Sequence, residues 1–314
     1  MISRILPAVS AVTTRMPPGL RRTYGDISNR ILDTSAVYRH LRSTVAEMGS
    51  ALLDFSRAPE TDSEHRLCEF AALIRPFTSA DLTLTRVGSA ADGAYAMAAV
   101  GEDIDAAISI GVGHDVSWDQ AIAAKRIPVT MFDPTVAGLP SPVPGGTFHR
   151  IGIGIPGATP APDLHGMDLR PLDDLLELAR VSASTELLLK IDVEGAEWDA
   201  LRDVDFAVFQ QVLIEMHDIA RLSDPKQAEA VLETVRKLAQ THCPVHVHAN
   251  NEGAFNRFDR FWFPDVIEAS YVRKDLLAGA TPATRLVEGL DIPSNPQYPD
   301  YDMSGLLTAA VLNT

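Results

Sequence analysis

The most constraining feature of this 314-residue chain is an alternation of apolar strands and helical segments that begins near residue 106. Alternating units of this kind favour a mostly parallel sheet that helices cover on both faces. We therefore predict a doubly wound α/β domain. Strand patterns fall at 106–111, 128–132, 147–155, 186–192, 211–217, 244–249 and 266–272, the last as an edge or antiparallel strand. Helix patterns fall at 117–125, 171–181, from about residue 195, and at 225–240.

The first part of the chain has a different pattern and is predicted to form an N-terminal helical extension. Apolar residues recur at helical spacing over 28–55, and a second helix is expected over 62–74. We assign residues 1–80 to this extension and residues 81–314 to the main domain. Two short extended runs open the main domain, at 82–87 and 94–100.

Two of the predicted helices begin with pairs at capping-box spacing. Thr61 and Glu64 stand three residues apart before the helix at 62–74. Ser117 and Gln120 have the same spacing at the start of the helix at 117–125. In such a pair, each side chain accepts a hydrogen bond from the other residue's backbone N–H.

The formal net charge of −15 is unevenly distributed. Residues 1–50 carry seven Lys/Arg against three Asp/Glu, so the remainder is strongly acidic. An acidic surface repels phosphate backbones, so we expect no nucleic-acid partner. We expect the basic first segment to pack on the acidic domain as a solvated arm. Peripheral contact with anionic lipid or with an acidic partner is the alternative.

The cysteine content indicates the compartment. Cys68 and Cys243 are the only two cysteines, which excludes a disulfide framework and favours a reducing, cytoplasmic location. No apolar run reaches the ~20 residues that a membrane-spanning helix needs. The composition specifies no oligomeric state.

The end of the first main-domain strand has the features of a nucleotide-cofactor site. Gly111 and Gly113 allow a tight turn and a close approach of a ligand to the next helix N-terminus. Asp133 ends the next strand at an offset from Gly113 that suits hydrogen bonds from both hydroxyls of a ribose. A third glycine is absent and Asp115 stands beside the turn. We therefore favour S-adenosylmethionine over a dinucleotide.

The fourth strand leads into the most specific segment of the chain, which reads Lys-Ile-Asp-Val-Glu-Gly-Ala-Glu over residues 190–197. This segment resembles the K-I-D-x-E-G-x-E block of FkbM-type methyltransferases. Other segments resemble motifs of that family in the same order. They are the glycine turn at 108–119, the segment 132–135, the lead-in segments 86–88 and 92–95, and the C-terminal segments 248–251 and 268–271.

The resemblance implies a class I methyltransferase, with a Rossmann-like, mostly parallel, seven-stranded sheet and S-adenosylmethionine as cofactor. It implies O-methylation of a hydroxyl on a sugar, or on a glycosylated or natural-product small molecule, because FkbM-like enzymes often modify such compounds. The predicted cofactor-binding residues are Gly111, Gly113, Asp115 and Asp133, to which the lead-in resemblance adds Asp92 and Tyr95.

The candidate catalytic residues follow the fourth and fifth strands. Asp192 ends an apolar strand, where a carboxylate is costly unless it binds a ligand or is well hydrogen-bonded. Glu194 follows it, and Glu215 and His217 share one face of the next strand. If these strands are neighbours, about 4.8 Å apart, Asp192 and His217 form a workable carboxylate–imidazole general base.

Each of these candidates also has a structural alternative. Glu194 would then only cap the next helix, Asp192 would bind backbone amides, and His217 would be a satisfied structural histidine. A metal is a further hypothesis, in which Asp192, Glu215 or His217 holds a magnesium ion.

The histidine-rich segment 242–248 is a weaker metal candidate. A seventh strand is expected between this segment and the strand of His217, which places His248 roughly 10 Å from His217. That distance is long for a shared metal and suits a substrate wall. The predicted substrate-binding residues are Glu215, His248, Asn250 and Asn251.

Two other functions compete with methyl transfer. An NAD(P)-dependent Rossmann oxidoreductase would need a third glycine and a catalytic Tyr-Lys or His-Asp pair, which the sequence does not offer. A non-catalytic binding module on the same fold would have no need for the strand-end acids Asp133 and Asp192. The sequence names neither the methyl acceptor nor the accepting atom.

Overall fold

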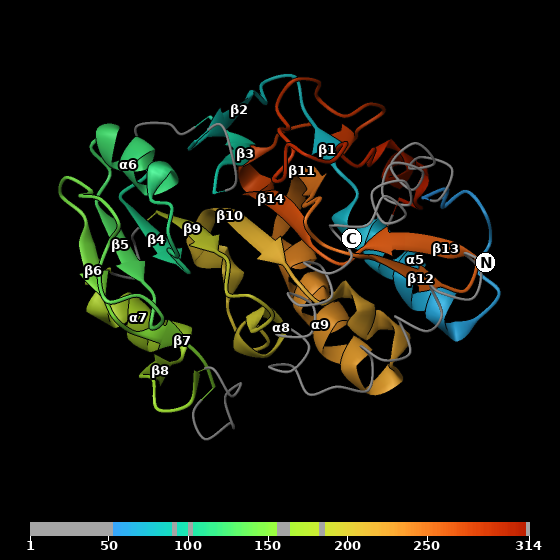
Figure 1. The fold of residues 1–314 in the computed structure, drawn as a ribbon. Coiled ribbons are helices and arrows are strands. Elements are labelled where there is room, and N and C mark those ends of the chain that lie inside the picture. The colour runs from blue at the N-terminus through green and yellow to red at the C-terminus, as the bar shows by residue number, and fades with distance from the viewer. Residues whose placement is uncertain (1–52, 90–92, 100–102, 156–163, 182–185, 312–314) are drawn as a thin grey trace.

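The computed structural model describes residues 53–89, 93–99, 103–155, 164–181 and 186–311. Its centre is a seven-stranded sheet in the order β11-β14-β10-β9-β4-β5-β6 (Figure 1). Only β14 runs antiparallel to its neighbours. The strands are β4 (Ala106–Ile110), β5 (Val129–Phe132), β6 (Thr147–His149), β9 (Leu187–Ile191), β10 (Phe209–Met216), β11 (His242–Ala249) and β14 (Ile267–Arg273).

Helices cover both faces of this sheet, as the alternation predicted. The helices are α5 (Asp62–Ile74), α6 (Ser117–Ala124), α7 (Leu172–Leu178), α8 (Glu197–Ala200) and α9 (Pro225–Thr241). Short 3-10 helices are η2 (Phe206–Val208), η3 (Ile219–Ser223), η4 (Lys274–Leu276) and η5 (Ser304–Thr308). Two-stranded sheets pair β1 (Phe77–Thr78) with β15 (Thr281–Pro282), β2 (Leu84–Val87) with β3 (Tyr95–Ala98), β7 (Gly152–Ile153) with β8 (Leu169–Arg170), and β12 (Phe255–Phe258) with β13 (Phe261–Pro264).

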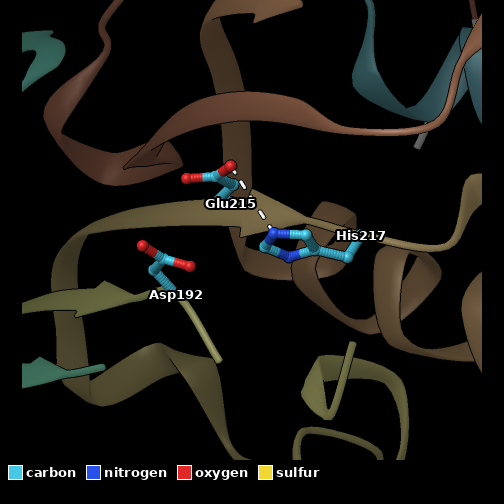
Figure 2. Close-up of side chains that lie close together, drawn as sticks. All are labelled: Asp192, Glu215 and His217. Atoms are coloured by element: carbon cyan, nitrogen blue, oxygen red, sulfur yellow. Dashed lines mark ion pairs between the residues drawn. The ribbon is translucent and has the colours of Figure 1, made fainter. Parts of the chain in front are cut away.

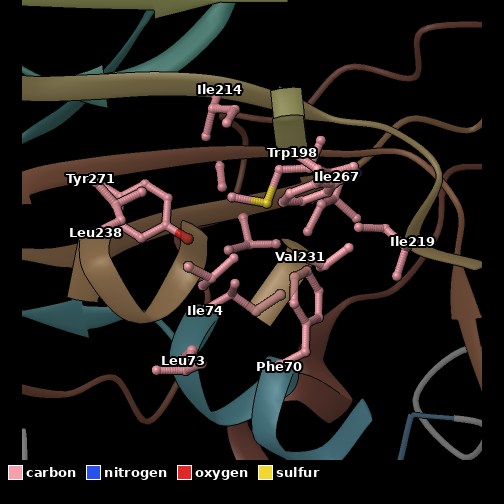
Figure 3. Packing of buried hydrophobic residues seen from close by; sticks show 14 of the residues in the cluster. Phe70, Leu73, Ile74, Trp198, Ile214, Ile219, Val231, Leu238, Ile267 and Tyr271 are labelled. Atoms are coloured by element: carbon pink, nitrogen blue, oxygen red, sulfur yellow. The ribbon is translucent and has the colours of Figure 1, made fainter. Parts of the chain in front are cut away.

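The two faces of the sheet bury separate apolar clusters, because successive strand side chains point to opposite faces. Leu189 and Ile214 pack on one face with α5, α7, α8 and α9. Leu188 and Leu213 pack on the other with α6 and the β2–β3 hairpin. Figure 3 shows the first cluster, in which α5 and α9 meet beneath the sheet. All residues of β9 and β10 are buried, which explains the runs of apolar residues in both strands.

Helix α5 has the predicted bounds, and the hydroxyl of Thr61 accepts a hydrogen bond from the N–H of Glu64 at 3.2 Å. The reciprocal bond is absent, because the Glu64 carboxylate accepts from the N–H of Glu60 instead. The second capping-box prediction was wrong. Ser117 is the first residue of α6 rather than its cap, and its hydroxyl accepts from the N–H of Ser89.

One strand prediction needs correction. The segment predicted as one strand over 147–155 bends at Arg150, where the N–H of Ile151 donates to the carbonyl of His149, and its two halves join different sheets. The predicted strand at 266–272 is β14, which is antiparallel and lies between β10 and β11, where a seventh strand was expected. The helix expected from residue 195 is only the single turn α8. The sequence patterns did not predict the β12–β13 hairpin.

The predicted extension is described only from residue 53 onward, so nearly all of the helix expected at 28–55 lies outside the described residues. Helix α5 packs in the same apolar cluster as α9. The domain division at residue 80 stays a prediction. None of the helices in the described ranges is long and apolar enough to cross a membrane.

Candidate active site

The carboxyl ends of β4 and β9 touch directly at the glycine turn. Gly111 has φ +81°, and a Cβ added there would lie 1.6 Å from the carbonyl oxygen of Asp192. The N–H of Asp192 donates to the carbonyl of Ile110 at 2.9 Å. Gly113 also has a positive φ, +56°, but a Cβ at Gly113 would meet nothing within 4 Å. Gly111 therefore joins two strand ends, while Gly113 leaves open space at the start of α6.

The carboxylate of Asp133 holds the backbone of the glycine turn in place. One carboxylate oxygen accepts from the N–H groups of Val112 and Gly113, at 3.0 and 2.8 Å. The other accepts from the N–H and the hydroxyl of Thr135, at 2.7 and 2.6 Å. Burial opposes the charge of this carboxylate, but these hydrogen bonds hold its pKa below the ordinary value. A carboxylate offers about four acceptor positions, and these four hydrogen bonds from the chain occupy them. The positions that were expected to accept hydrogen bonds from the ribose hydroxyls are therefore already taken.

The remaining predicted cofactor residues border the same turn. Asp115 accepts from the N–H of Ser117 at 2.6 Å, so its carboxylate caps the start of α6. A Cβ on Gly93 would lie 3.0 Å from Asp115, so the lead-in segment packs against this acid. Tyr95 is buried, with its ring 5.6 Å from the Lys190 ammonium. Asp92, the other lead-in prediction, lies outside the described residues.

Lys190 of β9 contacts the glycine turn. It was not among the predicted site residues. Its ammonium donates to the carbonyl of Gly111 at 2.7 Å, and its side chain is almost fully buried. Asp119 of α6 is buried on the same face. Burial raises the pKa of Asp119, and the charge of Lys190 opposes that rise. The lysine of the K-I-D block therefore ties β9 to the glycine turn.

Asp192, Glu215 and His217 converge at the ends of β9 and β10 (Figure 2). The two strands are parallel neighbours, with Ile191 opposite Ile214, so the residues that follow stand side by side. One ligand atom from each of the three side chains lies within 4.8 Å of the others. The Nε2 of His217 is 3.5 Å from Glu215. The predicted proximity of the carboxylate and the imidazole is therefore present.

A buried glutamate orients His217. The Nδ1 of His217 lies 2.9 Å from the carboxylate of Glu197, which is 0% exposed. Glu197 also accepts from the N–H groups of Gly195 and Val193. The indole of Trp198 donates to the carbonyl of His217 at 2.7 Å, which fixes the backbone. Glu197 is the last glutamate of the K-I-D-x-E-G-x-E block, so the block marks this residue, although its spacing does not show which glutamate turns inward.

Glu194 lies at the outer side of this cluster. It adopts a left-handed backbone conformation, with φ +57°, and its side chain is 56% exposed. Its carboxylate is 3.8 Å from the Nε2 of His217. Glu194 thus faces the same ring nitrogen as Glu215, but from the solvent side.

The charges of the cluster shift its pKa values. Burial disfavours a charged His217, but Glu197, Glu215 and Asp192 outweigh that effect and raise its pKa well above 6.5. Burial raises the pKa of Asp192 to about 6, against the opposing charges of Lys190 and His217. Burial also favours a higher pKa for Glu197, but the charge and the hydrogen bond of His217 lower this pKa below its ordinary value. The surrounding carboxylates therefore favour the protonated form of the His217 ring.

Of the predicted substrate-binding residues, Glu215 belongs to the cluster itself, and Asn250 borders it through an amide that donates to Glu215 at 3.0 Å. His248 is held instead by Asp300, at 3.1 Å, and by Glu268, at 3.5 Å. Asn251 donates to the carbonyls of Asn295, Tyr298 and Pro299. The last two predicted residues thus fasten the C-terminal segment.

The histidines of 242–248 do not form a metal site. His242 bonds to the carbonyl of Phe209, and His246 bonds to Asp291 at 2.7 Å, apart from the partners of His248. Within the described ranges, Asp192, Glu215 and His217 are the only such group close enough to share an ion.

A mostly parallel seven-stranded sheet with this strand-end site is consistent with an α/β methyltransferase fold. The family model of the methyltransferase FkbM domain matches residues 163–240, which contain Asp192, Glu197 and His217. The match confirms the resemblance to FkbM-type methyltransferases. No curated protein and no solved structure gave a significant match.

Proposed function

We propose that this protein is an S-adenosylmethionine-dependent O-methyltransferase that acts on a hydroxyl of a sugar, or of a glycosylated or natural-product small molecule. The observation that carries the proposal is the convergence of Asp192, Glu215 and His217 beside the glycine turn at Gly111. The glycine turn that we assign to the cofactor and a group of proton-accepting side chains thus share one edge of the sheet. The family match supports methyl transfer, and the sugar acceptor rests on the resemblance alone.

Two features of the glycine turn support its assignment to the cofactor. Space is open at Gly113, and the turn leads directly into the N-terminus of α6. Asp133 shapes this turn, and its bonds to Val112 and Gly113 fix the backbone that a nucleoside would contact. S-adenosylmethionine supplies a methyl group made electrophilic by its sulfonium. Asp115, at the mouth of the turn, is the acid we assign to the cofactor's amino group.

The side chains at the ends of β9 and β10 supply the rest of the reaction. The acceptor oxygen forms a bond to the methyl carbon as the carbon–sulfur bond breaks, and the hydroxyl proton must pass to a base. Glu215 is bonded to Asn250 and faces His217, and His217 is paired with Glu197. Asp192 is the carboxylate next to the glycine turn, so we assign it the role of the base that accepts this proton. His217 then helps to position the acceptor beside Asp192.

Label transfer tests the acceptor class. The protein would be incubated with methyl-tritiated S-adenosylmethionine and one type of acceptor at a time. The acceptors are a panel of hexosides, deoxyhexosides and glycosylated polyphenols, then total RNA, then a protein lysate. The proposal predicts label in a small hydroxylated compound, together with S-adenosylhomocysteine. Label recovered only on RNA or protein would contradict it. Asp192→Asn should reduce the transfer by roughly 10²–10⁴-fold.

A further inference from the structure

The cluster at the ends of β9 and β10 has the composition of a metal site. It brings two carboxylates, from Asp192 and Glu215, and one imidazole, from His217, within 4.8 Å of one another. Ligand atoms about 2.1 Å from one ion are at most about 4.2 Å apart, so a small contraction would complete the coordination. The amide of Asn250 lies behind Glu215 and holds that carboxylate in place.

The hydrogen bond between Glu197 and His217 is the second observation. A metal-bound histidine usually donates its other ring N–H to a carboxylate, which fixes its tautomer and orientation. The Nδ1 of His217 is 2.9 Å from the buried carboxylate of Glu197, so the Nε2 lone pair is directed toward Glu215. Glu197 is in turn held by two backbone N–H groups.

The charges around His217 favour a cation. The carboxylates of Glu197, Glu215 and Glu194 all lie within 4 Å of its ring nitrogens, and Asp192 adds a fourth nearby. Even a protonated His217 would carry only one positive charge beside these four carboxylates. The ammonium of Lys190 is committed to the carbonyl of Gly111. An ion with a charge of two between Asp192 and Glu215 would add positive charge where these carboxylates converge.

We infer that Asp192, Glu215 and the Nε2 of His217 bind one divalent cation of the Mg²⁺ and Mn²⁺ class, with Glu197 as the carboxylate that orients His217. Two of the three ligands are hard oxygen donors and none of the three is a cysteine, which favours these ions over softer ones. Three protein ligands leave coordination positions open for water or for an acceptor oxygen.

The role of the ion rests on the proposed function. A hydroxyl bound to a divalent cation loses its proton more readily than a free hydroxyl. Asp192 can bind the ion through one oxygen and receive the proton on the other. The open positions would also favour acceptors with two adjacent oxygens, such as the vicinal diol of a sugar, over isolated alcohols.

Binding of Mn²⁺ to the full chain tests the site without any acceptor. Electron paramagnetic resonance should report one bound Mn²⁺ per chain, displaced by excess Mg²⁺. Asp192→Asn and Glu215→Gln should each weaken binding by more than about 100-fold, and Glu197→Gln by about 10–100-fold. The control is Asp199→Asn, which removes a carboxylate on α8 that is 61% exposed and pairs with Arg202. It should bind Mn²⁺ like the wild type.

Thermal unfolding of each metal-free variant separates loss of a ligand from loss of fold. If a folded wild type binds no Mn²⁺, or if folded Asp192→Asn and Glu215→Gln bind it normally, the inference is wrong. S-adenosylmethionine binding in the presence of chelator is measured separately. If the protein binds Mn²⁺ but not S-adenosylmethionine, the metal site is supported and the proposed function is contradicted. If it binds S-adenosylmethionine but not Mn²⁺, only the metal site is contradicted.

Discussion

The carboxylate of Glu197 lies 2.9 Å from the Nδ1 of His217, and it is completely buried at the start of α8. This one contact connects the helix that follows β9 to the end of β10. It sets which nitrogen of His217 faces Asp192 and Glu215. The geometry of the site therefore depends on a residue that would not touch an acceptor.

Replacing Glu197 with Gln should disturb His217 without emptying the space around it. In the metal-free protein, the pKa of His217 should fall toward 6.5, because the nearest negative charge is removed. Methyl transfer should fall by about 10–100-fold. A histidine NMR titration and a rate measurement on the same sample would test both effects. A pKa of His217 that does not change would contradict the role given to Glu197, and Asp199→Asn provides the matched control.

The two glycines of the turn should respond differently to alanine. At Gly111 the new Cβ would collide with the carbonyl of Asp192, which is backbone and cannot rotate away. At Gly113 only the left-handed φ is unfavourable, which costs about 1–2 kcal/mol. Urea unfolding should therefore show a much larger loss for Gly111→Ala than for Gly113→Ala. Equal losses would mean that the close approach of β4 and β9 is not present in solution.

Asp133→Ala should weaken both the fold and the cofactor site. It removes the acceptor for Val112, Gly113 and Thr135, and hydrogen bonds to a charged group are worth about 1.5–3 kcal/mol. The free energy of unfolding and the affinity for S-adenosylmethionine should fall together. Thr135→Val, which removes only the hydroxyl contact, should have a smaller effect on both. A fully stable Asp133→Ala protein with reduced affinity would instead assign Asp133 to the ribose.

His248 should make the stability depend on pH above neutrality. Burial lowers the pKa of this ring, but bonds to Asp300 and Glu268 outweigh burial and raise it to about 10. A pKa raised on folding stabilises the native state fully below the unfolded value of about 6.5, and this stabilisation is lost as the pH rises to about 10. The stability difference between wild type and His248→Gln should therefore shrink from pH 6 to pH 10. Denaturant unfolding across this range would test it, and a widening difference would contradict it.

The sequence predicted the placement of Asp192, Glu215 and His217 because apolar strands fix where each strand ends, and parallel neighbours bring those ends together. It did not predict the role of Glu197, because the spacing of the block does not show which glutamate turns inward. The roles of His248 and Asn251 depend on residues 295–300, far along the chain. No local pattern encodes such contacts. The bend at Arg150 likewise divides the segment between two sheets, and the pairing of β7 with β8 involves residues farther along the chain.

The most direct test of the account is calorimetry of the purified protein with three compounds: S-adenosylmethionine, S-adenosylhomocysteine and NAD. The glycine turn, held by Asp133 and Lys190, should bind the first two at micromolar concentrations and should give no heat with NAD. Gly111→Ala, if folded, should lose this binding. Tight binding of NAD with no response to either sulfur compound would contradict the assignment as a methyltransferase.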